Sequence, residues 1–469
     1  MFIEIIKKGV SQLTRLRHPR LLTVQHAMEE SRDSLAFCTE PVYASLANVL
    51  GRVDNMPSVP DYLTNFQLLD VEARHGIFQI TEALAFLHQD ARILHRNIAP
   101  QSVIINCKGG WKLAGFDFCV ASNATTPGQT PTYPLIEWEP DLMPCVQPSL
   151  DYLAPEYVVG GRCDAASDMF SLGILCCAVF NKGRTPMDNC NNLSTFKKNA
   201  KELKALPPNV LRSLPEVFRD DVKMCLNYTP DLRPDATQFS KVAYFDDVTI
   251  KTLSYLESLC QMDNVQKGEF FKGLPNVLDR FPKRALIQKI FPFLTAEFAT
   301  PELIPFILPS VFHIGEQASE AEFAAVIFPD LIPIFSIQKP FQISLMILQK
   351  MELLLNKTPE AEIRRHLLPL IYNALGSNTA KIQELCLSIV PKVAKLVDKE
   401  SMKTQLLPKL LTLTTDSSVL SVKVNSLLCI GKLLDNLEAW MVTDKILPFL
   451  PKINSKEPGV LMAILGIKS

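Results

Sequence analysis

The first part of the chain mixes a helical pattern with short strand-like runs. Apolar residues recur at helical spacing over residues 3–17, which predicts an amphipathic helix that ends at His18-Pro19. Two strand-like runs follow at 21–25 and 34–39, and the polar residues 29–33 between them indicate a hairpin. The beginning of the chain therefore predicts a helix packed beside a small sheet.

Further elements follow in the same style up to about residue 247. The pattern predicts a short helix over 45–50 and a long helix over 71–88. Two short strands are predicted at 103–106 and 111–114, joined by a tight turn at Lys108-Gly109-Gly110.

A proline-rich stretch interrupts this pattern. Six prolines lie within residues 118–150, so we expect an irregular surface loop there, and regulation of its Thr- and Pro-rich part, 122–148, stays open. Regular structure resumes with an apolar helix over 167–180, followed by further helices to about residue 247. We assign residues 1–247 to a first, α+β domain with a mostly helical larger part.

Residues 248–469 show only helical patterns with short breaks. A Phe-Pro or Leu-Pro step recurs there with a period typical of HEAT or armadillo helix pairs, at Pro292, Pro329, Pro369, Pro408 and Pro448. Each proline is predicted to begin a helix, where its missing N–H is tolerated. We therefore expect an all-α solenoid, an architecture that presents an extended binding surface. The lone histidines His313 and His366 are interpreted as structural residues.

Composition narrows the classes of function. Of 469 residues, 47% are hydrophobic and 21% are charged, which is typical of a globular protein, and the net charge of −1 makes nucleic acid an unlikely partner. The 12 cysteines show no zinc-site spacing, and no apolar run is long enough to span a bilayer. With no signal peptide in view, these features predict a soluble cytoplasmic protein without a metal site.

One motif links the first domain to a known chemistry. Residues 94–102 contain His95-Arg96-Asn97, and Gly115-Phe116-Asp117 follows. Protein kinases carry His-Arg-Asp with an Asn five positions after that Asp, and then Asp-Phe-Gly. The chain resembles a protein kinase that begins at its third helix, where Leu13 lies. Ala154-Pro155-Glu156, the helix beginning near Asp168 and the Arg233-Pro234 step match later landmarks of that fold.

The resemblance implies that each chemically active position has changed. Asn97 stands where kinases have the aspartate that accepts the substrate proton, and Ala99 replaces a lysine that contacts the transferring phosphate. Ser102 replaces a magnesium-binding asparagine, and Gly115 replaces the main magnesium aspartate. Gly9 replaces the glutamate that pairs with the catalytic lysine. No intact catalytic residue remains by this comparison.

Packing positions of the kinase fold are retained. Leu13, His95 and Phe116 match members of the hydrophobic spine, and Arg96 and Asp168 match structural positions. By the same resemblance, Glu156 is expected to pair with Arg233. The combination predicts a pseudokinase rather than an enzyme. Asp117 remains a candidate magnesium ligand, so ATP and magnesium binding, with residual serine/threonine kinase activity, stays open as an alternative.

A degenerate kinase domain followed by HEAT-like repeats resembles the SCY-one-like pseudokinase family. Local sequences such as Phe-Phe-Lys-Gly-Leu-Pro at 270–275 and Ser-Lys-Glu-Pro at 455–458 are most similar to its coated-vesicle-associated branch. The resemblance implies a scaffold in clathrin-dependent trafficking between plasma membrane, endosomes and trans-Golgi. Its implied partners are clathrin and AP-type adaptor complexes, with the protein peripheral to membranes.

The sequence also departs from that family. Relatives carry a complete small lobe before the residue matching Met1 and a longer C-terminal tail, so we expect a shortened isoform or an incomplete gene model whose last repeat, ending at 460–466, is partial. A further alternative is a solenoid that binds RNA or a nuclear transport factor. It would need a basic stripe, for which the candidates are Lys381, Lys392, Lys395, Lys403, Lys409, Lys423 and Lys432. Which coat protein and which repeat face are used stays open.

Overall fold

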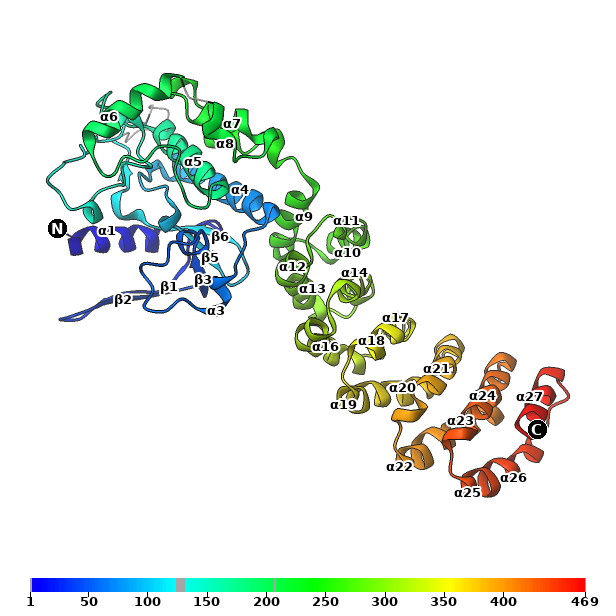
Figure 1. Cartoon of the computed structure of the whole chain (residues 1–469). Coiled ribbons are helices and arrows are strands. Elements are labelled where there is room, and N and C mark those ends of the chain that lie inside the picture. Colours follow the sequence, from blue (N-terminus) through cyan, green and yellow to red (C-terminus); the bar gives the residue numbers. More distant parts are fainter. Residues whose placement is uncertain (1, 124–130, 206–207, 469) are drawn as a thin grey trace. The chain divides into compact units, whose positions relative to one another are not determined.

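The computed structural model describes residues 2–123, 131–205 and 208–468. The chain divides into two units, Met1–Tyr255 and Leu256–Ser469 (Figure 1). The boundary predicted at residue 247 falls at the start of helix α9 (Val248–Glu257), which crosses the division.

The first unit combines short strands with a larger set of helices. Its strands are β1 (Val24–Glu30), β2 (Leu35–Thr39), β3 (Val42–Ser45), β4 (Ile93–Leu94), β5 (Val103–Asn106), β6 (Trp111–Leu113) and β7 (Val120–Ala121). Its other helices are α1 (Phe2–Arg15), α2 (Leu46–Val49), α3 (Asp61–Thr64), α4 (Asp70–Phe86), α5 (Ala165–Phe180), α6 (Leu193–Glu202), α7 (Arg219–Cys225) and α8 (Ala236–Phe239). β1 pairs with β2, β3 with β5 and β6, and β4 with β7, all antiparallel.

The first strand of the hairpin lies later in the chain than the sequence predicted, whereas β2 matches the strand predicted at 34–39. β1 begins at Val24 and runs through the polar residues to Glu30, and β3 was not predicted. Most side chains of β1 are exposed, so apolar alternation gives almost no signal for its bounds. Leu21, assigned to the first strand, instead forms a parallel bridge to Leu113 and is buried.

The proline-rich stretch contains more order than predicted. β7 and a 3₁₀ turn at Pro144–Val146 lie within it, while residues 124–130 of the predicted loop lie outside the described residues. The buried Gln147 side chain accepts a hydrogen bond from the Glu139 N–H and donates to the Glu139 carbonyl. The Trp138 indole donates to the Pro148 carbonyl at 3.1 Å. These bonds hold the chain where no regular element forms.

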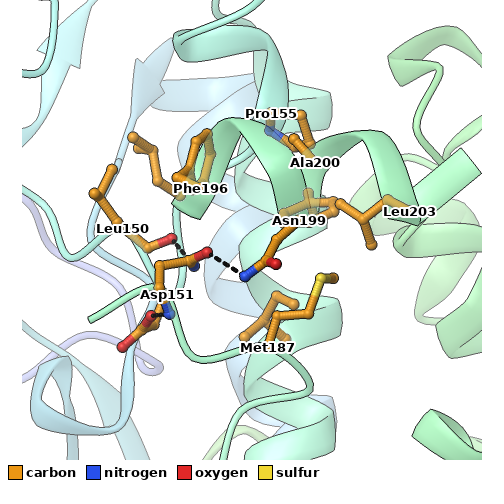
Figure 2. A pocket seen from close by; sticks show the side chains of 12 residues that line it. Leu150, Asp151, Pro155, Met187, Phe196, Asn199, Ala200 and Leu203 are labelled. Atoms are coloured by element: carbon orange, nitrogen blue, oxygen red, sulfur yellow. Dashed lines mark hydrogen bonds between the residues drawn. The ribbon is translucent and has the colours of Figure 1, made fainter. Parts of the chain in front are cut away.

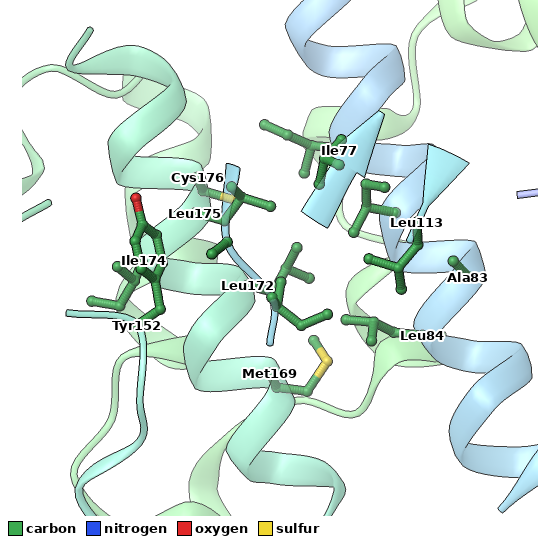
Figure 3. Close-up of a cluster of buried hydrophobic side chains, with 14 of the residues drawn as sticks. Ile77, Ala83, Leu84, Leu113, Tyr152, Met169, Leu172, Ile174, Leu175 and Cys176 are labelled. Atoms are coloured by element: carbon green, nitrogen blue, oxygen red, sulfur yellow. The ribbon is translucent and has the colours of Figure 1, made fainter. Parts of the chain in front are cut away.

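The core of the first unit lies between two long helices. Ile77 and Leu84 of α4 face Leu172 and Cys176 of α5, with Leu113 of β6 beside them (Figure 3). All five side chains are fully buried. This core fixes the helices that carry the candidate site.

The second unit contains no strand among the residues that the structure describes. Its helices are α10 (Asn264–Gly273), α11 (Pro275–Leu278), α12 (Lys283–Ala285), α13 (Phe291–Ala296), α14 (Ile304–Gln317), α15 (Glu320–Glu322), α16 (Phe328–Leu331), α17 (Gln342–Gln349), α18 (Met351–Lys357), α19 (Glu360–Glu362), α20 (Leu368–Leu375), α21 (Ala380–Val393), α22 (Lys399–Ser401), α23 (Leu407–Asp416), α24 (Leu420–Leu433), α25 (Ala439–Met441), α26 (Leu447–Phe449) and α27 (Pro458–Lys468). α10, α14, α17, α21, α24 and α27 contact one another in that order. The helices thus stack in succession, as in a HEAT-like solenoid.

Each recurring proline is the second residue of an α-helical segment (α13, α16, α20, α23 and α26), close to the predicted helix start, but none of these segments begins a separate helix. Each proline lies inside a continuous helix, two residues after a π-helical turn; the turns are Leu286–Ile290, Phe323–Ile327, Ile363–Leu367, Met402–Leu406 and Val442–Ile446. In every case the residue before the proline donates its N–H to the carbonyl five residues back, as Phe291 does to Leu286. Proline crowds the preceding turn and lacks an N–H, and the wider turn accommodates both effects.

Contacts between successive helices connect the solenoid. The Lys357 ammonium group donates to the carbonyls of Gly315 (2.9 Å), Glu316 (2.8 Å) and Ala318 (2.5 Å) at the end of α14. A cation at a helix C-terminus compensates carbonyls that lack intrahelical partners. Lys357 therefore joins the end of α18 to the end of α14.

Candidate functional site

One buried carboxylate organises the loop at 94–102. Asp168, near the start of α5, accepts hydrogen bonds from the backbone N–H groups of His95 (2.7 Å) and Arg96 (2.8 Å). The His88 imidazole lies 3.1 Å from the same carboxylate. Burial alone would raise the pKa of Asp168, but these partners hold it below its usual value. Asp168 thus fixes the backbone of the loop.

Arg96 ties this loop to the segment after the second motif. Its backbone has φ +65°, and its buried guanidinium donates to the carbonyls of Phe118 (3.4 Å) and Ile136 (2.9 Å). The same group lies 5.1 Å from the ring centre of Tyr157. The Arg96 guanidinium is therefore held by two backbone carbonyls and an aromatic ring, and it links the 94–102 loop to the proline-rich segment.

The apolar positions expected to form a spine are buried in one cluster. The rings of His95 and Phe116 meet edge to face with centroids 4.7 Å apart, and Leu13 of α1 lies in the same core. A His95 ring nitrogen lies 2.9 Å from the Ala114 carbonyl. Burial lowers the pKa of His95 to about 4, so the imidazole is neutral at pH 7.

Asn97, Ser102 and Gly115 lie together at the centre of the site. The Asn97 amide donates to the Gly115 carbonyl at 3.1 Å, so this side chain links two loops and offers no base. Gly115 has φ +73°, and a Cβ there would lie 2.5 Å from Ser102 Oγ and 2.9 Å from Ser102 Cβ. The buried Ser102 therefore leaves no room for a side chain at position 115 in this conformation. Ala99, also buried, contributes no charge.

Gly9 and Asp117 form a second close approach, beneath α1. A Cβ at Gly9 would lie 2.4 Å from Asp117 Oδ1 and 3.0 Å from the Asp117 backbone nitrogen. The carboxylate fills the space that a glutamate at position 9 would need. Burial raises the pKa of Asp117. Asp117 lines a pocket against α1 that neither Asn97 nor Ser102 lines.

Glu156 and Arg233 form the pair expected from the sequence. The Arg233 guanidinium donates to both carboxylate oxygens, at 2.7 and 3.0 Å, and both side chains are almost completely buried. Ser167 donates to the same carboxylate at 2.7 Å, and Arg233 also donates to the Asn227 carbonyl. Such a fully hydrogen-bonded pair fixes one arrangement of the larger helical part.

Two hollows lie near these loops. An open groove of about 790 Å³ runs along β3 and α2, and Arg52 is the one cation among its described lining residues. Arg52 donates to the Gly183 carbonyl at 3.1 Å. The described lining offers no lysine to neutralise a nucleotide's phosphates.

The second hollow is a cavity of about 20 Å³ lined by Phe196 and Asn199 of α6, by Leu203 just after that helix, and by Leu150 and Asp151 (Figure 2). A volume of this order admits about one water molecule. No cluster of three or more potential metal-ligating side chains occurs in the described ranges.

Sequence reasoning missed the pocket that Asp117 shares with residues 136–148. The proline density of that segment predicted an irregular loop, and the structure gives it defined walls. A lone tryptophan, Trp138, was the available signal for a packed site within it.

A protein kinase domain model matches residues 4–245, the span that carries all these motifs. The chain belongs to the protein kinase family. It is also a homologue of SCY1-like protein 2: the Homo sapiens protein is 50% identical over 471 residues, covering 99% of this chain and 50% of that protein. The protein kinase domain-containing protein ppk32 of Schizosaccharomyces pombe is 30% identical, covering 99% of this chain and 63% of that protein.

A more distant relative has a name that describes it as a probable inactive kinase. The protein named probable inactive serine/threonine-protein kinase scy1 in Dictyostelium discoideum is 22% identical, covering 92% of this chain and 48% of that protein. The chain spans about half the length of the curated relatives it matches. No helix in the described part of the chain is long and apolar enough to cross a membrane.

Proposed function

We propose that this chain is a catalytically inactive, kinase-like scaffold that acts in clathrin-dependent vesicle trafficking between plasma membrane, endosomes and trans-Golgi. The observation that carries the inactive part is the close approach of Gly115 to Ser102. A residue that binds magnesium through a side chain at position 115 has no room in this conformation. Phosphoryl transfer depends on bound magnesium and on positioned charges, so a site without this magnesium ligand is expected to lose most of its catalytic rate.

The remaining catalytic positions support the same proposal. Asn97 and Ala99 supply neither a base nor a cation, and Gly9 is closed off by Asp117. Loss of a positioned base alone costs about 10²–10⁴ in rate. Asp117 remains the one candidate magnesium ligand, and it faces α1 rather than Ser102.

The trafficking part rests on the helical repeats and on the likeness to SCY1-like protein 2. A solenoid presents a long surface suited to protein partners, and we propose clathrin and AP-type adaptor complexes as those partners. Sedimentation with assembled clathrin cages, with and without AP complexes, tests this. We expect the chain to pellet with cages that carry AP complexes; chain that stays in the supernatant under both conditions contradicts the proposed partners.

The RNA-binding alternative loses support from the positions of the candidate lysines. Lys392 lies 3.4 Å from Glu352, Lys409 donates to the Tyr372 carbonyl, and Lys423 donates to the Thr415 carbonyl. These contacts engage three of the seven candidate cations within the repeats.

A thermal-shift titration with ATP and magnesium tests the inactive part. A ligand that binds the native state stabilises it by mass action, by about 2.7 kcal/mol when its concentration is 100 times its Kd. The melting temperature rises as a result. We expect no magnesium-dependent rise. Asp141→Asn makes the same charge change at an exposed loop position. A rise that disappears in Asp117→Asn but persists in Asp141→Asn would show magnesium-dependent ATP binding through Asp117 and would contradict the loss of the metal site.

A further inference from the structure

A walled pocket beneath α1 is lined in part by Arg96 and Asp117 of the two motif loops, but not by Asn97, Ser102 or Gly115. It has a volume of about 170 Å³ and lies between α1, the turn at 116–118 and residues 136–148. Its apolar walls come from Ile5, Ile136, Trp138, Leu142, Val146 and Leu153. A cavity of about 150 Å³ admits a group the size of benzene, whereas drug-sized ligands occupy about 300–1,000 Å³. The pocket therefore suits one large side chain rather than a nucleotide.

Hydrogen bonds within residues 139–148 give this pocket a fixed wall. The buried Gln147 amide binds the Glu139 backbone at 2.9 and 3.0 Å and also donates to the Leu142 carbonyl at 3.3 Å. The Trp138 indole N–H is bound to the Pro148 carbonyl, which sets the orientation of the ring. The wall is built by internal contacts before any ligand arrives, so binding requires little ordering of the loop.

The charges around the pocket favour a cation. Three carboxylates line it: Asp117, Glu137 and Glu139. Among the described residues, the Asp117 carboxylate has a hydrogen bond only from its own backbone amide. No described residue forms an ion pair with Glu137 or Glu139.

The cations that line the pocket already have partners. Lys8 donates to the Cys119 carbonyl at 2.9 Å, and Arg96 donates to the Phe118 and Ile136 carbonyls. Residues 124–130, which complete the loop, contain no charged residue. The bonds of Lys8 and Arg96 to neutral carbonyls leave both cations charged, so three ionised carboxylates against two cations give the lining a net charge of −1. That net charge favours an incoming cation over an anion.

We propose that this pocket docks an arginine side chain presented by a segment of a partner protein. Arginine combines a long apolar stem with a planar cation that binds a carboxylate through two N–H groups and stacks on an aromatic ring. The apolar walls accept the stem, Asp117 receives the guanidinium, and Trp138 offers its face. This docking goes beyond the proposed scaffold role, and it holds whether or not clathrin is the partner.

The test uses the full chain labelled with 5-fluorotryptophan, in which Trp138 reports on the pocket by ¹⁹F NMR. The probe is the peptide Ac-Leu-Arg-Leu-NH₂, titrated to about 1 mM. The matched control peptide carries citrulline, which has nearly the same shape as arginine without its charge. We expect the arginine peptide to shift the Trp138 resonance saturably and at least 10-fold more tightly than the citrulline peptide.

Two variants separate the pocket from general attraction between charges. Asp117→Asn should weaken binding of the arginine peptide at least 10-fold, whereas Asp141→Asn, on the same loop but outside the lining, should change it less than twofold. Asp117→Asn should leave the urea midpoint unchanged or higher, because it removes a carboxylate whose only hydrogen-bond donor among the described residues is its own amide. No saturable shift, equal binding of the citrulline peptide, or equal loss in both variants would overturn the proposal.

Discussion

Replacing Gly115 by alanine tests the reason for which the site cannot hold a kinase aspartate. The residue has φ +73°, and a non-glycine residue in left-handed conformation costs about 1–2 kcal/mol. The added Cβ would lie 2.5 Å from Ser102 Oγ, and Ser102 is itself buried. Such overpacking costs about 1–3 kcal/mol. We therefore expect Gly115→Ala to destabilise the first unit by about 2–5 kcal/mol.

Gly161 offers a matched control for this substitution. It has φ +60°, and a Cβ there would meet no atom within 4 Å. Gly161→Ala therefore carries the backbone cost without the collision and should lose only about 1–2 kcal/mol. The difference between the two variants isolates the collision with Ser102, for which we expect about 1–3 kcal/mol.

Urea unfolding followed by ¹⁹F NMR of 5-fluorotryptophan measures the two units separately. Trp111, which is buried in β6, reports on the first unit, and Trp440 reports on the repeats. The midpoint from Trp111 should fall in Gly115→Ala while the midpoint from Trp440 stays constant. A loss in Gly115→Ala that equals the loss in Gly161→Ala would refute the steric argument, and with it the main support for an inactive site.

Three further predictions concern stability. Lys357→Met should destabilise the repeats by about 1–3 kcal/mol, because three carbonyls lose a charged donor. The control Lys350→Met breaks an exposed ion pair and should cost less than about 1 kcal/mol. Urea unfolding midpoints compare the two variants. Arg233→Met should cost about 3–5 kcal/mol by leaving Glu156 buried and unpaired, and a smaller loss when Glu156→Gln is added would show the coupling in a double-mutant cycle. The pKa of His95 is about 4 in the folded chain and about 6.5 in the unfolded chain, so the free energy of unfolding should fall by up to about 3 kcal/mol as the pH drops from 6.5 to 4. If the pH dependence of the free energy of unfolding is unchanged in His95→Phe, His95 is excluded as its source.

The sequence predicted the elements whose signals are local and strong. The helix at α4 and the strands β5 and β6 follow from apolar spacing and a glycine turn. The pairing of Glu156 with Arg233 was implied by the resemblance to protein kinases, and the structure contains it. In each case, one pattern of side chains permits few structures.

The remaining features depend on contacts that no single stretch encodes. Asp117 lies against Gly9 because α1 packs on its turn, and the two residues are more than 100 positions apart. The bounds of β1 were displaced because both of its faces are largely exposed. The prolines of the repeats suggested helix starts, since the sequence carries no separate signal for the wide turn that lets a helix continue.

The wide turns of the repeats also carry a historical consequence. A π-helical turn holds one more residue than an α-helical turn, and it lies at the same distance before each of the five periodic prolines, Pro292, Pro329, Pro369, Pro408 and Pro448. Five separate one-residue insertions at equivalent places are a far less economical origin than a single insertion that was later copied. One insertion in an ancestral helix pair, copied together with its proline as the array lengthened, would account for all five turns.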